Sequence, residues 1–152
     1  MVGDRIVRAT LMACVTAVMI STSASTQGKT FKARLSVVPI DATMQATIAG
    51  TGSVSAALTG TKLSITGAFE GLRSPATIAQ LHRAQRGVRG PVLQSTSDLQ
   101  VTHGTSGTIS GSIELTAMQI TDLEQGRLYL QLHSEKAPDG NLWGWLLSKE
   151  GK

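Results

Sequence analysis

Alternation of hydrophobic and polar residues, with a period of two, dominates the chain from Lys29 onward. The alternation runs through four segments, residues 31–37, 53–69 with a turn around Gly60, 107–115 and 127–133. A period of two is the spacing of a β-strand with one buried face. Several short strands of this kind, separated by turns rich in Gly, Ser, Thr and Pro, predict an all-β fold, either an antiparallel β-sandwich or a Greek-key barrel.

One segment, TAMQITDLEQG (residues 116–126), departs from the period of two. Thr116 followed three residues later by Gln119 is the pattern of a capping box at the start of a helix. Gly126 has the position of a glycine just beyond the helix end. The sequence therefore predicts one short helix that lies against the sheet, whereas residues 41–51 carry no decisive pattern.

The first 24 residues have a different composition. Arg5 and Arg8 precede a mainly apolar stretch of 12 residues (9–20), and STSAS then supplies the small residues of a cleavage site after Ala24. A helix needs about 20 apolar residues to cross a bilayer, so this stretch is too short for a transmembrane span. We expect a signal peptide over 1–24, a short linker over 25–30 and one β domain over 31–148. The protein is then secreted or periplasmic; an uncleaved anchor or core helix is the alternative.

The charge and cysteine content narrow the function classes. Cys14 is the only cysteine and lies in the predicted signal peptide, so cleavage excludes disulfides and thiol catalysis. LMAC (residues 11–14) is similar to a lipoprotein processing box, but the apolar stretch before it is too short for one. The mature part keeps 12 Lys/Arg and 9 Asp/Glu residues, a net charge of +3. This excess is too small for a typical nucleic-acid-binding surface, and we expect no nucleic-acid partner.

Three of the five aromatic residues, Tyr129, Trp143 and Trp145, lie in the last predicted hairpin. A turn over residues 138–140 would place them together on the outer face, with His133 opposite Trp145. Clustered exposed aromatic rings often mark an interface with a protein or a carbohydrate. The alternative is that the 116–126 helix or a loop covers the rings and closes a second small core.

Several short motifs follow one another in a recognisable order. They are FKARL (31–35), QLHRAQ (80–85), GPV (90–92), LTAMQ (115–119), GRLYLQLH (126–133) and PDGNLWGWL (138–146). In this order and spacing the chain resembles the chordin-type (CHRD) domain family over about residues 31–147, as a bacterial, secreted, single-domain member. The resemblance implies an antiparallel β-sandwich or Greek-key barrel and no particular activity.

Two histidines are candidate metal ligands. The resemblance places His82 at the second position of the family's His-x-His pair, where this chain has Gln80 at the first. His82 and His133 would lie at the ends of two polar-faced strands, and imidazole is a common ligand of copper and zinc. A catalytic zinc needs three protein ligands and a structural zinc needs four. The alternative is that both histidines hydrogen-bond loop backbone.

The arginines of HRAQRGVRG are additions to the family pattern. Arg83, Arg86 and Arg89 have no aromatic neighbours and no obvious helix after them, so we expect a solvated loop that contacts an acidic partner rather than a phosphate cradle. No Gly-x-Ser-x-Gly motif and no carboxylate pair indicates an enzyme. The leading interpretation is a non-enzymatic binding or structural module without a cofactor. Its partner would be an extracellular protein or glycan, bound by the arginines and by the aromatic face of Tyr129, Trp143 and Trp145. The alternative is a copper- or zinc-binding protein.

Overall fold

The computed structural model describes residues 28–93 and 99–149 as an antiparallel β structure with one short α-helix. The predicted signal peptide lies outside the described residues. The elements are β1 (Lys29–Val37), a 3-10 turn η1 (Met44–Ala46), β2 (Thr51–Thr59), β3 (Lys62–Glu70), β4 (Ala76–Arg83), β5 (Gln100–Val101), β6 (Gly107–Glu114), α1 (Ala117–Glu124), β7 (Leu128–Ser134), β8 (Ala137–Trp145) and β9 (Leu147–Ser148). The predicted all-β class and the short helix are confirmed, and β1 begins two residues before the predicted domain start.

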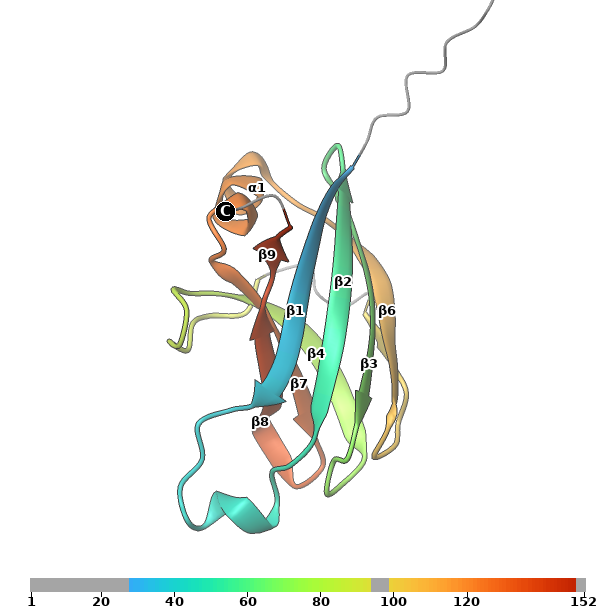
Figure 1. Cartoon of the computed structure of the whole chain (residues 1–152), viewed down its shortest axis with the longest axis vertical. Coiled ribbons are helices and arrows are strands. Elements are labelled where there is room, and N and C mark those ends of the chain that lie inside the picture. Colours follow the sequence, from blue (N-terminus) through green and yellow to red (C-terminus); the bar gives the residue numbers. More distant parts are fainter. Residues whose placement is uncertain (1–27, 94–98, 150–152) are drawn as a thin grey trace, which may run out of the picture.

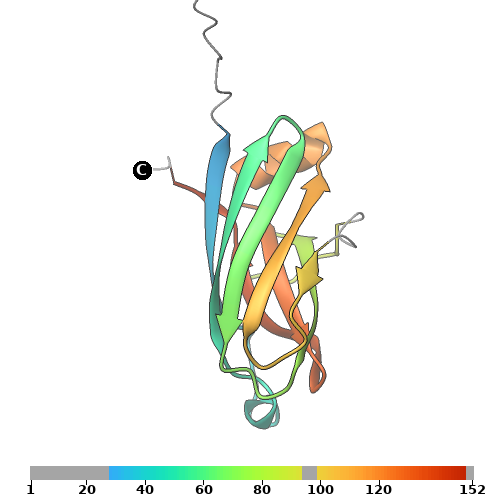
Figure 2. The same ribbon diagram turned by 90° about the vertical axis from the view of Figure 1, so that its right-hand side faces the viewer.

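The strands form one nearly closed, barrel-like sheet in the order β4-β7-β8-β1-β2-β3-β6-β5, with β9 paired to β1. β1 joins the two halves, because residues 29–35 pair with β2 whereas Ser36 and Val37 pair with β8 (Figure 1). Figure 2 shows β1, β2, β3 and β6 side by side, with α1 across one end and η1 at the other. The layered arrangement gives β4, β7 and β8 an inner and an outer face.

The inner faces form the main core as the alternation predicts. In β1, β2 and β3 the buried positions alternate with exposed ones along most of each strand. Leu35, Leu63, Ile65, Leu81 and Leu130 are completely buried in this core. Burial of each such side chain contributes about 1.5–3 kcal/mol relative to exposure, so these alternating positions supply the main drive for folding.

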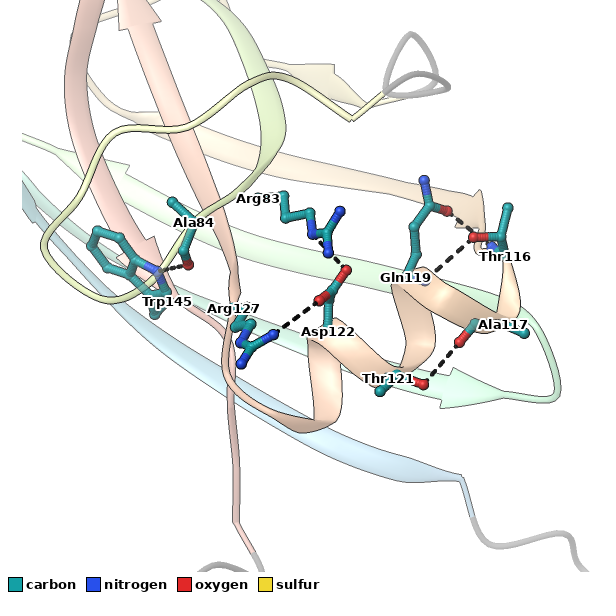
Figure 3. Close-up of polar contacts among 9 residues, drawn as sticks. All are labelled: Arg83, Ala84, Thr116, Ala117, Gln119, Thr121, Asp122, Arg127 and Trp145. Atoms are coloured by element: carbon teal, nitrogen blue, oxygen red, sulfur yellow. Dashed lines mark hydrogen bonds and ion pairs between the residues drawn. The ribbon is translucent and has the colours of Figure 1, made fainter.

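The helix α1 follows its sequence signals closely. Thr116 Oγ1 accepts a hydrogen bond from Gln119 N, and the Gln119 side chain accepts one from Thr116 N, which completes the capping box (Figure 3). Gly126 follows the helix with φ +65°, a conformation that favours glycine. Leu123 is buried in the main core. Over residues 28–93 and 99–149, no helix has the length and apolarity required to cross a membrane.

The predicted turn of the last hairpin is wrong. The turn lies at Glu135–Lys136, and the register pairs Tyr129 with Trp145 rather than His133 with Trp145. Contacts from a distant segment hold this turn, because Glu135 N donates to the carbonyl oxygen of Pro75 and Lys136 N donates to a serine hydroxyl. The error shifts the register by four residues, an even number, so both tryptophans still share a face with Tyr129.

Candidate functional site

A cluster of five aromatic and histidine rings lies on the outer face of β4, β7 and β8. The ring of Tyr129 lies 4.9 Å from that of His82, 5.8 Å from that of Trp143 and 4.7 Å from that of Trp145, measured between ring centroids. The rings of His82 and His133 are 6.3 Å apart. We call these five residues the ring cluster. The sequence prediction that the two tryptophans and Tyr129 lie together is confirmed.

The ring cluster is mostly buried. Tyr129 is completely inaccessible, Trp143 is 8% exposed, and Trp145 is partly buried. Val38 and Ile48 from the β1–β2 connection pack with these rings as a second hydrophobic cluster, together with Ala137 and the partly buried Met44 and Ala84. The expectation of an exposed aromatic face is therefore wrong, and the alternative of a second small core holds. Loops cover the rings, and α1 does not.

The segment of residues 83–90, which we call the arginine loop, is tied to the ring cluster by hydrogen bonds. Trp145 Nε1 donates to Ala84 O at 3.1 Å, and Gly90 N donates to the Tyr129 hydroxyl at 3.1 Å. His82 Nδ1 lies 3.0 Å from Gly90 O. Arg89 donates to the backbone oxygen of Asp139 in β8 at 3.0 Å. The loop is thus fixed at both ends by polar atoms of buried rings.

The arginine loop returns antiparallel to the end of β4. Arg83 N donates to Pro91 O, and His82 forms an isolated bridge with Val92. The QLHRAQ and GPV motifs therefore lie side by side at the base of the loop.

Two arginines meet a buried carboxylate beside the loop. Arg83 Nε lies 2.7 Å from Asp122 Oδ2, an ion pair without hydrogen-bond alignment, and Arg127 Nη1 lies 3.9 Å from Asp122 Oδ1 (Figure 3). The Asp122 side chain is 4% exposed, whereas both arginine side chains are 47% exposed. Arg83 and Arg127, with Ala84, Gln85 and Pro91, line an open surface hollow of about 360 Å³.

The remaining two arginines lie on either side of the loop. Arg86 is exposed, and its guanidinium lies beside Gly126, next to Arg127 in the chain. Arg89 is exposed on the side that contacts β8. Sequence reasoning found the three loop arginines but missed Asp122 and Arg127. No sequence pattern links Asp122 with Arg83, because the two residues are far apart in the chain and approach only through the β4–β7 pairing.

The two candidate metal ligands have matching surroundings. His82 is 7% exposed and His133 is 8% exposed. Each Nδ1 lies near a backbone oxygen, Gly90 O for His82 at 3.0 Å and Pro138 O for His133 at 2.7 Å. Both histidines therefore hydrogen-bond backbone, as the alternative reading expects. Each Nε2 is buried and has no hydrogen-bond partner among the described residues.

Burial lowers the pKa of His82. The hydrogen bond to Gly90 opposes this effect, and the proximity of His133 and Arg89 adds to it. The neutral imidazole is therefore favoured. Within residues 28–93 and 99–149, no group of three or more His, Cys, Asp or Glu side chains is placed to hold a metal ion.

Comparison with protein families matches residues 31–146 to the CHRD domain. The chain belongs to the CHRD domain family. No curated protein and no solved structure matches it in the corresponding comparisons. In this CHRD domain three of the motif positions, His82, Gly90 and Tyr129, are joined by hydrogen bonds where the arginine loop meets the ring cluster.

Proposed function

We propose that this CHRD-domain protein is a secreted, non-enzymatic binding module whose arginine loop binds an acidic extracellular protein or glycan. The observation that carries the proposal is an open hollow at the fixed loop that is lined by Arg83 and Arg127, with the Arg86 guanidinium beside Gly126. A preorganised loop loses little conformational entropy when a partner binds, so its arginines are favourable contact residues. The predicted signal peptide supports an extracytoplasmic site of action.

The chemistry of the hollow favours an anion. Guanidinium groups present planar sets of N–H donors that match carboxylates and sulfates. Asp122 forms an ion pair with Arg83 and lies near Arg127, yet both arginine side chains remain about half exposed. Arg86 makes no hydrogen bond or ion pair with any described residue and adds a further positive charge. The buried rings leave the arginines, rather than Tyr129 and Trp143, as the exposed part of the predicted binding surface.

The test is binding to three immobilised polymers: polyglutamate, dextran sulfate and neutral dextran. We expect the protein to bind one of the anionic polymers and to leave neutral dextran unbound. The double variant Arg86→Gln/Arg127→Gln should weaken binding at least about tenfold, as expected for loss of two charge-assisted contacts of roughly 1 kcal/mol each. Arg83 is kept, because its loss would leave the buried Asp122 carboxylate poorly paired.

A matched control separates a local site from general charge attraction. Lys32 and Arg34 are exposed on β1, and the double variant Lys32→Gln/Arg34→Gln removes the same charge from another surface. If this control weakens binding as strongly as the loop variant, attraction depends on net charge alone and the proposal fails. Preference for polyglutamate indicates an acidic protein, whereas preference for dextran sulfate indicates a sulfated glycan.

A further inference from the structure

The hydrogen bonds of His82 and His133 fix the position of their protons. A backbone carbonyl oxygen can only accept, so each Nδ1 must carry the hydrogen that it donates to Gly90 O or Pro138 O. In a neutral imidazole the other nitrogen then has a lone pair. Both Nε2 atoms are buried without a partner in the described part of the chain. With both rings neutral, the outer face contains two buried nitrogen lone pairs.

An unsatisfied acceptor of this kind costs about 1–3 kcal/mol. Three changes can satisfy the two lone pairs: protonation, a bridging water or a cation. Donation of Nδ1–H to a backbone carbonyl is also the usual arrangement behind a metal-ligating histidine, where it fixes the tautomer and orients the ring. Both histidines already have that arrangement.

The distance between the rings fits one bridging ion. If two imidazole nitrogens each lie about 2 Å from an ion on opposite sides, the ring centres are about 6 Å apart. The observed separation is 6.3 Å, and the ring planes differ by 29°.

The ligands and charges around the two rings favour a monovalent ion over a divalent one. No third His, Cys, Asp or Glu side chain in the described part joins the pair, so a divalent zinc ion would lack both ligands and compensating charge. Arg89 donates to Asp139 O, next to the Pro138 carbonyl that His133 contacts, and its positive charge opposes a divalent cation more strongly than a monovalent one. Copper in its cuprous state is monovalent and accepts two nitrogen ligands in a linear arrangement, and imidazole suits copper. We propose that His82 and His133 bind one cuprous ion between their Nε2 atoms.

The test is titration of the protein with Cu(I) under anaerobic conditions against a chromophoric Cu(I) chelator, repeated with Ag(I) and with Zn(II). All samples carry Cys14→Ser, because a thiol binds Cu(I) without help from the histidines. We expect one equivalent of Cu(I) or Ag(I) to bind and Zn(II) to bind at least about 100-fold more weakly. His82→Ala and His133→Ala should each lower Cu(I) affinity by at least about 100-fold, more than the loss of an outer-shell partner usually produces.

His103 is a matched control for these variants. Its Nδ1 also lies 3.0 Å from a backbone oxygen, that of Ala76, but its Nε2 lies 3.2 Å from Glu135 Oε1 and its side chain is 66% exposed. His103→Ala should therefore leave Cu(I) binding unchanged. Circular dichroism of each variant checks that it folds, and nitrogen NMR of the metal-free protein should show both His82 and His133 with the hydrogen on Nδ1.

Three results would overturn the proposal. They are absence of Cu(I) binding, binding that survives loss of either ring-cluster histidine in a folded variant, and Zn(II) binding as tight as Cu(I) binding. Absence of binding would assign the space between the rings to a bridging water.

Discussion

Replacement of Tyr129 by phenylalanine removes one hydroxyl and keeps the buried ring. That hydroxyl accepts the 3.1 Å hydrogen bond from Gly90 N at the far end of the arginine loop. The substitution leaves a partly buried N–H without its partner, at a cost of about 1–2 kcal/mol. The hydroxyl contacts only the loop, and the substitution keeps the packing of the ring. We therefore expect most of this free-energy cost to favour opening of the loop rather than unfolding of the sheet.

Trypsin measures loop opening directly, because Arg86–Gly87 and Arg89–Gly90 are cleavable bonds within the loop. A loss of 1–2 kcal/mol raises the population of the open loop by about 5- to 30-fold. When opening and closing are faster than cleavage, the cleavage rate at these two bonds rises by the same factor. The midpoint of thermal unfolding should fall by only a few degrees, about 3–6 °C if the whole cost also reaches global stability.

Thr116→Ala provides the control, since it removes the capping box of α1 and costs about 1 kcal/mol at a site outside the loop. It should lower the unfolding midpoint by a similar amount without faster cleavage after Arg86 or Arg89 in the folded protein. Equal acceleration in both variants would mean that cleavage follows global unfolding. An unchanged rate in Tyr129→Phe would show that the hydroxyl does not hold the loop, and would refute the reasoning.

Two further substitutions test the surroundings of the site. Asp122→Asn should destabilise the protein by about 1–3 kcal/mol in urea unfolding, because the amide no longer compensates Arg83 and Arg127; an unchanged midpoint would show that solvent already screens both pairs. Gly140→Ala should lower the thermal midpoint by at least the equivalent of about 1 kcal/mol, because Gly140 has φ +124° and a Cβ would lie 2.2 Å from Gln131 Nε2. A wild-type midpoint in Gly140→Ala would mean that β8 relaxes there without cost.

The strands and the helix could be predicted from the sequence because each depends on residues only a few positions apart in the chain. Alternation fixes which side chains of a strand face the core, and the pair Thr116 and Gln119 satisfies the first turn of α1 without help from elsewhere. The prediction of the hairpin turn was wrong because the position of that turn depends on residues far away in the chain. Pro138–Gly140 has the composition of a turn, but the chain turns at Glu135–Lys136, where atoms of Ser74 and Pro75 accept the backbone N–H groups.

The candidate site was only partly predictable because alternation identifies a face and not what covers it. Every residue of β7 is buried, although Tyr129, Gln131 and His133 occupy the polar phase of its alternation. The cover comes from the β1–β2 connection, whose sequence carries no decisive pattern, and from Ala84. Asp122 escaped detection because an isolated carboxylate on a short helix has no distinguishing neighbours in the sequence.

The ring cluster and the arginine loop depend on each other. Burial of a tyrosine hydroxyl, an indole N–H and an imidazole N–H is favourable only if each finds a partner, and the backbone of the loop supplies all three. Ala84 also packs against the second hydrophobic cluster, so packing and hydrogen bonds together hold the loop. None of these contacts uses the guanidinium of Arg86. The fold therefore depends on the backbone of the loop. The positive charge of Arg86 is not used in these contacts and is available to a partner.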